Sequence, residues 1–216
     1  EQIQRYLATF PNVIVTNFLE FRLYRNGVES MNVSIGRWNN IKSLRTAPPP
    51  EKINEFEGLL DRFVSYSLPA ITSAEELAKV LAQRTKFLRD EIVKIELPEN
   101  EDIRGFYEAF KKYLIADLTE DDFADLYAQT ITYGLFAARL RAGKDFNRIT
   151  AYTYIPKTIG ILRDIFGFVS MGALPKQMET IIDDIAGVLA ATDVKLILEQ
   201  YYKSGKGSDP IIHFYE

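Results

Sequence analysis

Short runs of β-branched and aromatic residues near the N-terminus predict a small sheet. Three such runs lie at residues 13–16, 19–25 and 28–35. Asn26-Gly27 separates the last two, and both residues tolerate the positive φ of a tight hairpin turn. The residues before the first run predict a helix. We therefore expect a small α/β part, a helix followed by a β-hairpin and one further strand.

Beyond residue 50 the pattern changes to apolar residues three and four positions apart, which is typical of amphipathic helices. Ser73 and Glu76 form a capping-box pattern that begins one of them, and Pro98 follows its end. We read residues 144–156 as a loop with aromatic residues. The pattern predicts helices over residues 53–64, 73–95, 101–115, 119–143, 157–169, 175–190 and 192–203.

Small residues mark the helix predicted at 119–143 as the centre of a bundle. Gly134, Ala137 and Ala138 lie about one turn apart, so their side chains would allow a neighbouring helix to approach closely. No internal repeat and no long heptad run occurs. The expected fold class is therefore mainly α, a multi-helix bundle preceded by the small α/β part.

The boundary between these parts is expected at a polar, basic connection over residues 37–50. It ends in Pro48-Pro49-Pro50, which lacks amide donors and suits neither a helix nor a central strand. We place the first part at residues 1–47 and the helical part at 48–216.

Composition is that of a folded protein, with 47% hydrophobic and 26% charged residues in a chain of 216. The sequence has no cysteine, which excludes disulfides and thiolate catalysis. It shows neither a signal peptide nor an apolar run near 18 residues. We expect a cytoplasmic protein with no membrane partner.

Positive charge is concentrated near the N-terminus. Residues 1–50 carry six Lys and Arg against three Asp and Glu, whereas 51–216 carry 20 against 27. An acidic helical body is poorly suited to bind DNA alone, since nonspecific affinity comes mainly from cations that neutralise phosphates. The best candidates for DNA contact are Arg37, Lys42 and Arg45 for the backbone and Trp38 for base stacking. The alternative, which we favour, is a solvated linker with Trp38 packed on the sheet.

Three blocks of the sequence resemble a known family. RYL at residues 5–7 with PNVIVTNFLEFRLYRNG at 11–27 is one block, LTEDDFADLYAQTITYGLFAARL at 118–140 is the second, and DPIIHFYE at 209–216 is the third. Their order is similar to that in large single-chain restriction-modification enzymes, which fuse a nuclease to an N6-adenine DNA methyltransferase. The resemblance implies that residues 1–47 are the C-terminal end of a nuclease-like domain and that the bundle leads into the methyltransferase.

This resemblance implies a non-catalytic connector that positions and couples the cleavage and methylation domains of one polypeptide. The intact parent would use Mg²⁺ and S-adenosylmethionine and would contact DNA, whereas this segment would bind no cofactor itself. Gln2, or else Gln4, falls where the family's nuclease carries an auxiliary Gln. The chain begins within this pattern, so we expect nuclease strands upstream. The alternative function is an autonomous helical module for protein–protein interaction.

Neither set of catalytic residues is expected within the chain. Glu20-Phe21-Arg22 imitates a nuclease Glu-x-Lys strand, but the first aspartate is Asp61, beyond the prolines, so the second metal-binding carboxylate is missing. Ala47-Pro-Pro-Pro50 lacks the amide and the aromatic ring of a methyltransferase loop. Gly205-Lys-Gly207 is too short for a cofactor loop.

The remaining polar groups have simpler explanations than metal binding. His213 is the only histidine and is expected to pack at a domain junction. The acidic group at residues 120–125 begins a helix, where negative charge complements the helix dipole. Asp183 and Asp184 are adjacent and point to different sides of a helix, so they form a poor metal pair.

Overall fold

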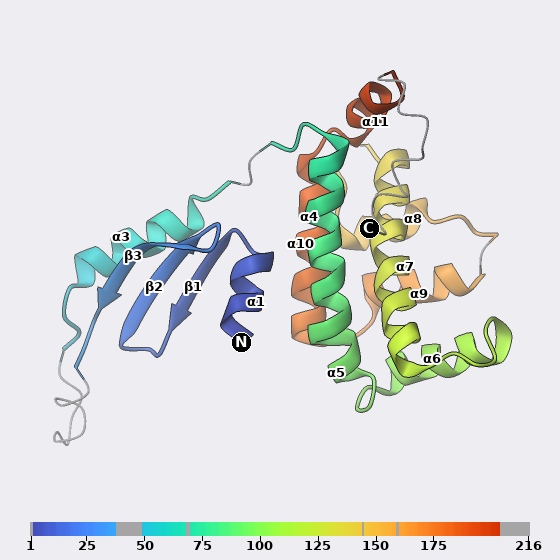
Figure 1. Ribbon diagram of the computed structural model, residues 1–216, viewed down its shortest axis with the longest axis horizontal. Coiled ribbons are helices and arrows are strands. Elements are labelled where there is room, and N and C mark those ends of the chain that lie inside the picture. The colour runs from blue at the N-terminus through green and yellow to red at the C-terminus, as the bar shows by residue number, and fades with distance from the viewer. Residues whose placement is uncertain (1, 38–48, 68–69, 144, 159, 204–216) are drawn as a thin grey trace. The chain divides into compact units, whose positions relative to one another are not determined.

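The computed structural model describes residues 2–37, 49–67, 70–143, 145–158 and 160–203. The chain folds as two compact units, Glu1–Leu68 and Pro69–Glu216. The first contains a small antiparallel sheet and the second is entirely helical in its described residues (Figure 1). The predicted fold class, a helical bundle preceded by a helix and hairpin, is confirmed.

The first unit begins with helix α1 (Gln2–Thr9) and continues with three strands. These are β1 (Asn12–Thr16), β2 (Glu20–Arg25) and β3 (Val28–Ser34), paired antiparallel in the order β1-β2-β3. Asn26 and Gly27 have φ values of 49° and 77°, so the hairpin turn uses positive φ at both positions, as the sequence predicts.

Helix α3 (Ile53–Val64) covers one face of this sheet. Leu59 is fully buried against Leu23 of β2 and Val33 of β3, and the rings of Phe56 and Phe21 lie 4.6 Å apart. The sequence predicts this helix but assigns it to the bundle. Because its apolar face completes the core of the sheet, the structure divides after residue 68 rather than after residue 47.

The helical unit opens with a long helix whose middle is widened. It comprises α4 (Ala74–Phe87), the π-helical segment η1 (Leu88–Val93) and α5 (Lys94–Glu96), without a break between them. Ser73 caps α4 by accepting a hydrogen bond from the Glu76 amide at 3.1 Å, as predicted, whereas the Glu76 carboxylate accepts from the Thr72 amide at 3.5 Å. The π turn lets the successive residues Ile92 and Val93 both face the core.

The predicted central helix is α7 (Glu120–Arg141), which contacts every other described helix of this unit. Those not yet introduced are α6 (Glu101–Tyr113), α8 (Arg148–Tyr154), α9 (Gly160–Met171), α10 (Lys176–Ala191) and α11 (Val194–Lys203). No helix in the described ranges is both long enough and apolar enough to cross a membrane.

A close approach between helices occurs at Gly134, as its position in the sequence predicts. A Cβ atom there would lie 2.2 Å from Cε2 of Phe166 in α9, so only glycine leaves room for the ring. Ala138 is also buried, whereas Ala137 is exposed. Gly134 and Ala138 therefore face the core and Ala137 faces solvent, so the three small residues do not form one continuous stripe.

Helix α8 corrects the expectation of a loop at 144–156. Asn147 accepts a hydrogen bond from the Thr150 amide at 2.9 Å, and Thr150 Oγ1 accepts one from the Asn147 amide at 3.0 Å. This reciprocal capping box uses Asn and Thr in place of the usual Ser or Thr with Glu. It stabilises a helix too short for a clear apolar period.

Candidate functional site

The basic connection is described only at its ends. Arg37 follows β3, and its Nε lies 3.7 Å from a carboxylate oxygen of Glu51. The Glu51 amide also donates to the Ile35 carbonyl at 2.8 Å, so the chain leaves and returns at nearly the same place. The Arg37 side chain remains 75% exposed, which leaves it accessible to a partner. Trp38, Lys42 and Arg45 lie outside the described residues, and their roles stay predictions.

The two nuclease-like features lie on the first unit. Gln2 is exposed at the start of α1, and its auxiliary role stays a prediction. Glu20 accepts hydrogen bonds from Asn32 at 2.8 Å and from Arg22 at 3.1 Å, and the Asn32 bond is the main cause that lowers the pKa of Glu20. Arg22 also approaches Glu29 at 3.5 Å. These partly exposed residues pair with one another along β2 and across to β3.

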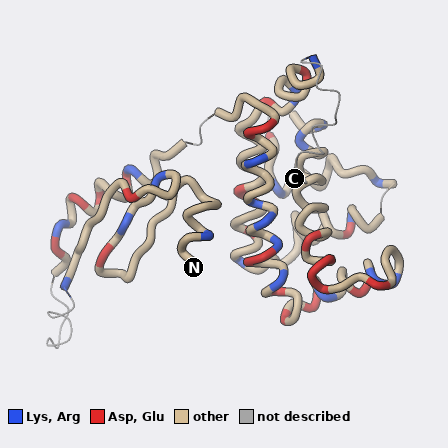
Figure 2. The backbone as a smooth tube through the Cα atoms, in the orientation of Figure 1, with Lys and Arg blue, Asp and Glu red and all other residues tan. Residues whose placement is uncertain are grey.

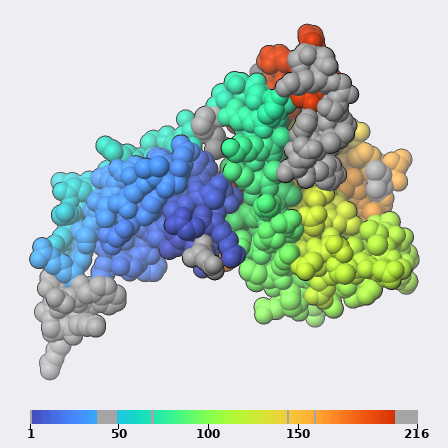
Figure 3. All heavy atoms as spheres, viewed as in Figure 1, coloured from blue at the N-terminus to red at the C-terminus, as the bar shows by residue number. Residues whose placement is uncertain are grey.

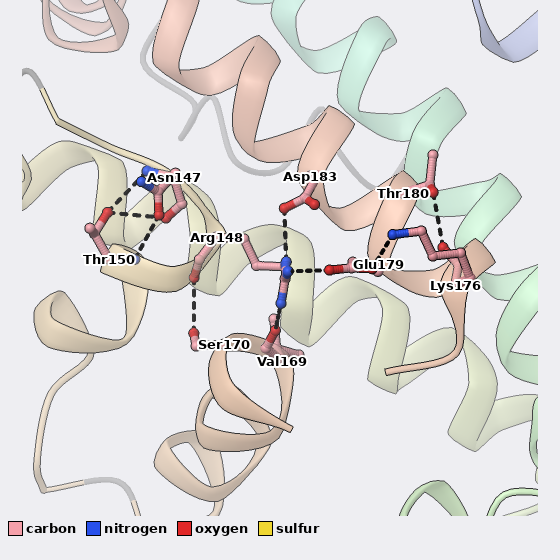
Figure 4. Close-up of polar contacts among 9 residues, drawn as sticks. All are labelled: Asn147, Arg148, Thr150, Val169, Ser170, Lys176, Glu179, Thr180 and Asp183. Carbon is pink, nitrogen blue, oxygen red and sulfur yellow. Dashed lines mark hydrogen bonds and ion pairs between the residues drawn. The ribbon is translucent and has the colours of Figure 1, made fainter. Parts of the chain in front are cut away.

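The second unit holds a buried arginine that joins three helices (Figure 4). Arg148 of α8 is 8% exposed and donates to Glu179 and Asp183 of α10 at 2.9 and 2.8 Å. It also donates to the Val169 carbonyl of α9 at 2.6 Å, while the Ser170 hydroxyl donates to the Arg148 carbonyl at 2.9 Å. The guanidinium spreads its donors in a fixed plane, which suits it to hold elements in a set geometry.

A second buried arginine, Arg84 of α4, is 2% exposed and donates to Asp184 of α10 at 2.6 Å. The adjacent carboxylates of Asp183 and Asp184 therefore bind different arginines, which agrees with the expectation that they point to different sides. Sequence reasoning missed both arginines. For Arg84 the sequence does contain a sign of burial, because Arg84 continues the helical spacing of the apolar residues Leu77 and Leu81.

The carboxylates at the start of α7 each have a polar partner. Glu120, Asp121 and Asp122 lie in its first turn, near the positive end of the helix dipole. Three of the four carboxylates link α7 to neighbouring elements: Glu120 with Arg104 at 2.6 Å, Asp121 with Lys94 at 2.8 Å and Asp125 with Arg89 at 2.9 Å. Asp122 instead accepts a hydrogen bond from the N-cap residue Thr119 at 2.6 Å, within the first turn of α7.

Arg89 continues this network within the π-helical segment. Its Nε donates to one carboxylate oxygen of Asp90 and its Nη2 to the other, both at 2.8 Å. This two-pronged contact is the main cause that lowers the pKa of Asp90, and Lys94 at 3.6 Å adds to it. The same carboxylate is the main cause that raises the pKa of Arg89.

A concave site of about 560 Å³ lies between α6 and α9. Its apolar lining comes from Phe106, Ala109, Leu114 and Ile161, and the Phe106 ring packs against that of Phe168 in a tilted arrangement, with the centroids 5.7 Å apart. Glycine and carboxylate residues supply most of the remainder. The sequence gives little sign of this site, because its two walls come from helices separated by more than 40 residues.

Comparisons with known proteins give no relative for this chain. No family model, curated protein or solved structure matches it. The resemblance of the three sequence blocks therefore stays a prediction.

Proposed function

We propose that this chain is a non-catalytic connector of a restriction-modification protein, placed between a nuclease and an N6-adenine DNA methyltransferase. The observation that carries the proposal is the order of the three sequence blocks, which begins in the first unit and ends at residue 216. The strands of the first unit carry one block and the central helix α7 carries the second. In this view the partners are the adjacent domains of the same polypeptide, and DNA is reached through the parent protein.

The architecture of the bundle supports a spacing role. Helix α7 has 22 residues, which corresponds to roughly 33 Å of helix. The buried arginines Arg148 and Arg84 hold neighbouring helices through ion pairs to partly exposed carboxylates, which favours one fixed arrangement over a set of looser ones. Such a body would hold two catalytic domains at a constant separation and transmit a displacement from one to the other.

The flanking reading frame in the source genome tests this proposal directly. We expect an Asp and a Glu-x-Lys strand just upstream of Glu1, and an Asn-Pro-Pro-Tyr type of loop downstream of Glu216. A stop codon soon after Glu216, with no catalytic motif upstream, would overturn the connector role.

The alternative function is an autonomous helical module that binds another protein. The observation in its favour is an exposed apolar run at the end of α6, where Tyr113, Leu114 and Ile115 are 70%, 56% and 46% exposed. Sedimentation velocity of the full chain tests whether this apolar run mediates self-association. Self-association that rises with concentration and is lost in Leu114→Asp would favour the alternative. A monomer at all concentrations would show that the run does not bind a second copy of the chain.

A further inference from the structure

The concave site between α6 and α9 combines an apolar surface with negative charge. Glu101 and Asp102 line it from the start of α6, and Asp164 lines it from α9. All three carboxylates are exposed, whereas Phe106, Ala109 and Ile161 are half-buried. Among the described lining residues there is no Lys or Arg, so the site has a formal charge of −3. Figure 2 shows acidic residues at the start of α6 and of α7.

The shape of the site fits an extended rather than a compact ligand. Its lining residues on α6 run from Glu101 to Tyr113, which corresponds to roughly 20 Å along a helix. Gly105 and Gly160 add no side chain to the lining, and a Cβ at either would meet nothing within 4 Å. Helix α6 lies at the molecular surface in the space-filling view (Figure 3). A groove of this length accommodates about three turns of another helix.

Charge and apolar area together select the chemistry of the partner. An apolar helix face would cover Phe106 and Ile161 and remove apolar area from water. Lysine or arginine residues flanking that face would lie opposite the carboxylates of Glu101, Asp102 and Asp164, whereas an acidic partner would be repelled. Helices of this kind commonly bind in apolar grooves through residues spaced three and four apart.

We propose that the groove between α6 and α9 is a docking site for a basic amphipathic helix from another protein or domain. This proposal stands independently of the connector role, because it rests on the groove alone. The partner places leucine-like side chains against Phe106, Ala109 and Ile161. Its cations pair with the carboxylates at the groove's edge.

The test uses the full chain and a fluorescein-labelled 16-residue peptide with Leu on one helical face and Lys on the flanks. We expect the Lys peptide to bind, more weakly at higher salt, and the same peptide with Glu in place of Lys not to bind. Ala109→Arg should fill the groove and weaken binding more than about tenfold. Glu101→Gln with Asp164→Asn should weaken it roughly threefold to tenfold.

A matched control separates the groove from general negative charge. Glu57→Gln with Glu199→Gln removes the same charge from exposed positions outside the lining and should leave affinity within about twofold. Amide NMR shifts should change at Gly105, Ala109 and Ile161 when the peptide binds. Three results would each overturn the proposal: no binding of the Lys peptide, equal weakening in the control, or shift changes away from α6 and α9. If Ala109→Arg fails to fold, the double variant and the shifts decide.

Discussion

At the residue scale, the interior of the bundle contains one hydroxyl whose burial works against stability. Tyr127 is fully buried between the rings of Phe123 and Phe106, and burial raises the pKa of its hydroxyl far above the usual value. No described residue lies within hydrogen-bond distance of that hydroxyl. Its desolvation is therefore uncompensated by the described residues.

Tyr127→Phe should consequently stabilise the protein. The substitution keeps the ring packing and removes the buried polar atom, so the free energy of unfolding should rise by about 1 kcal/mol. Urea denaturation followed by circular dichroism measures the change. A loss of stability instead would show that the hydroxyl has a partner such as a buried water.

Asp90 should make the stability of the bundle depend on pH. Its pKa lies below the ordinary value of 3.8, so the ionised carboxylate stabilises the fold above that value. This contribution is lost as pH falls below 3.8 through the lowered pKa. Asp90→Asn should therefore reduce the steepness with which unfolding free energy falls between pH 4 and pH 2. If the slope of Asp90→Asn equals that of the unsubstituted protein, other carboxylates cause the acid sensitivity.

Arg148→Met should lower the free energy of unfolding by about 2 kcal/mol, because it removes the donor to the Val169 carbonyl and to Asp183 and one of the two donors to Glu179. The value stays below that of a fully buried pair, since the Asp183 side chain is 52% exposed and can be rehydrated.

Lys176→Met is the control for this prediction. Lys176 also binds Glu179, but it is 87% exposed, so the loss of unfolding free energy should stay under about 0.5 kcal/mol. Similar losses in both variants would contradict a special role for burial.

At the scale of elements, helix crossings depend on which small residues face a neighbour. Gly134 faces Phe166, whereas Gly187 in α10 faces open space. Gly134→Ala should destabilise by about 2 kcal/mol through overlap with the ring, and Gly187→Ala should stabilise by about 1 kcal/mol through better helix propensity. Thermal unfolding of the two variants and of the unsubstituted protein measures these changes. Phe166→Leu should relieve most of the Gly134→Ala loss, and strict additivity of the two substitutions would refute direct contact.

Sequence predicted the elements better than it predicted their partners. The strands, the Asn26-Gly27 turn and the central helix α7 follow from local patterns that the fold preserves. The apolar face of α3 was equally clear, but periodicity does not say whether it covers a sheet or another helix, so the boundary was placed too early. Helix α8 was missed because seven residues are too few to show a period.

The same limit explains the candidate sites. Arg37 was proposed because it belongs to a local group of cations, and Gln2 because of the family resemblance; both roles stay predictions. The groove between α6 and α9 and the ion pair between Arg84 and Asp184 join residues far apart in the chain. Only the three-dimensional arrangement brings such residues together.

At the scale of the whole molecule, the two units should unfold as separate transitions. Each has its own core, Leu23, Val33 and Leu59 in the first and the residues around α7 in the second. The first unit is small and should melt at the lower temperature, since small domains bury a smaller fraction of their surface. Differential scanning calorimetry should show two peaks, and Arg148→Met should move only the upper one. A single peak that shifts as a whole would show that the units fold together.

The hydrogen bond between Glu51 and Ile35 gives the chain a natural insertion point. Because the backbone on both sides of residues 38–48 is held together there, a tag or a reporter domain placed between them would not need to alter the sheet or α3. A flexible linker added with the insert costs little, because each doubling of its length costs only about 0.6 kcal/mol in closure entropy. This segment is therefore where protein engineers would attach a fluorophore or affinity handle while leaving the described core intact.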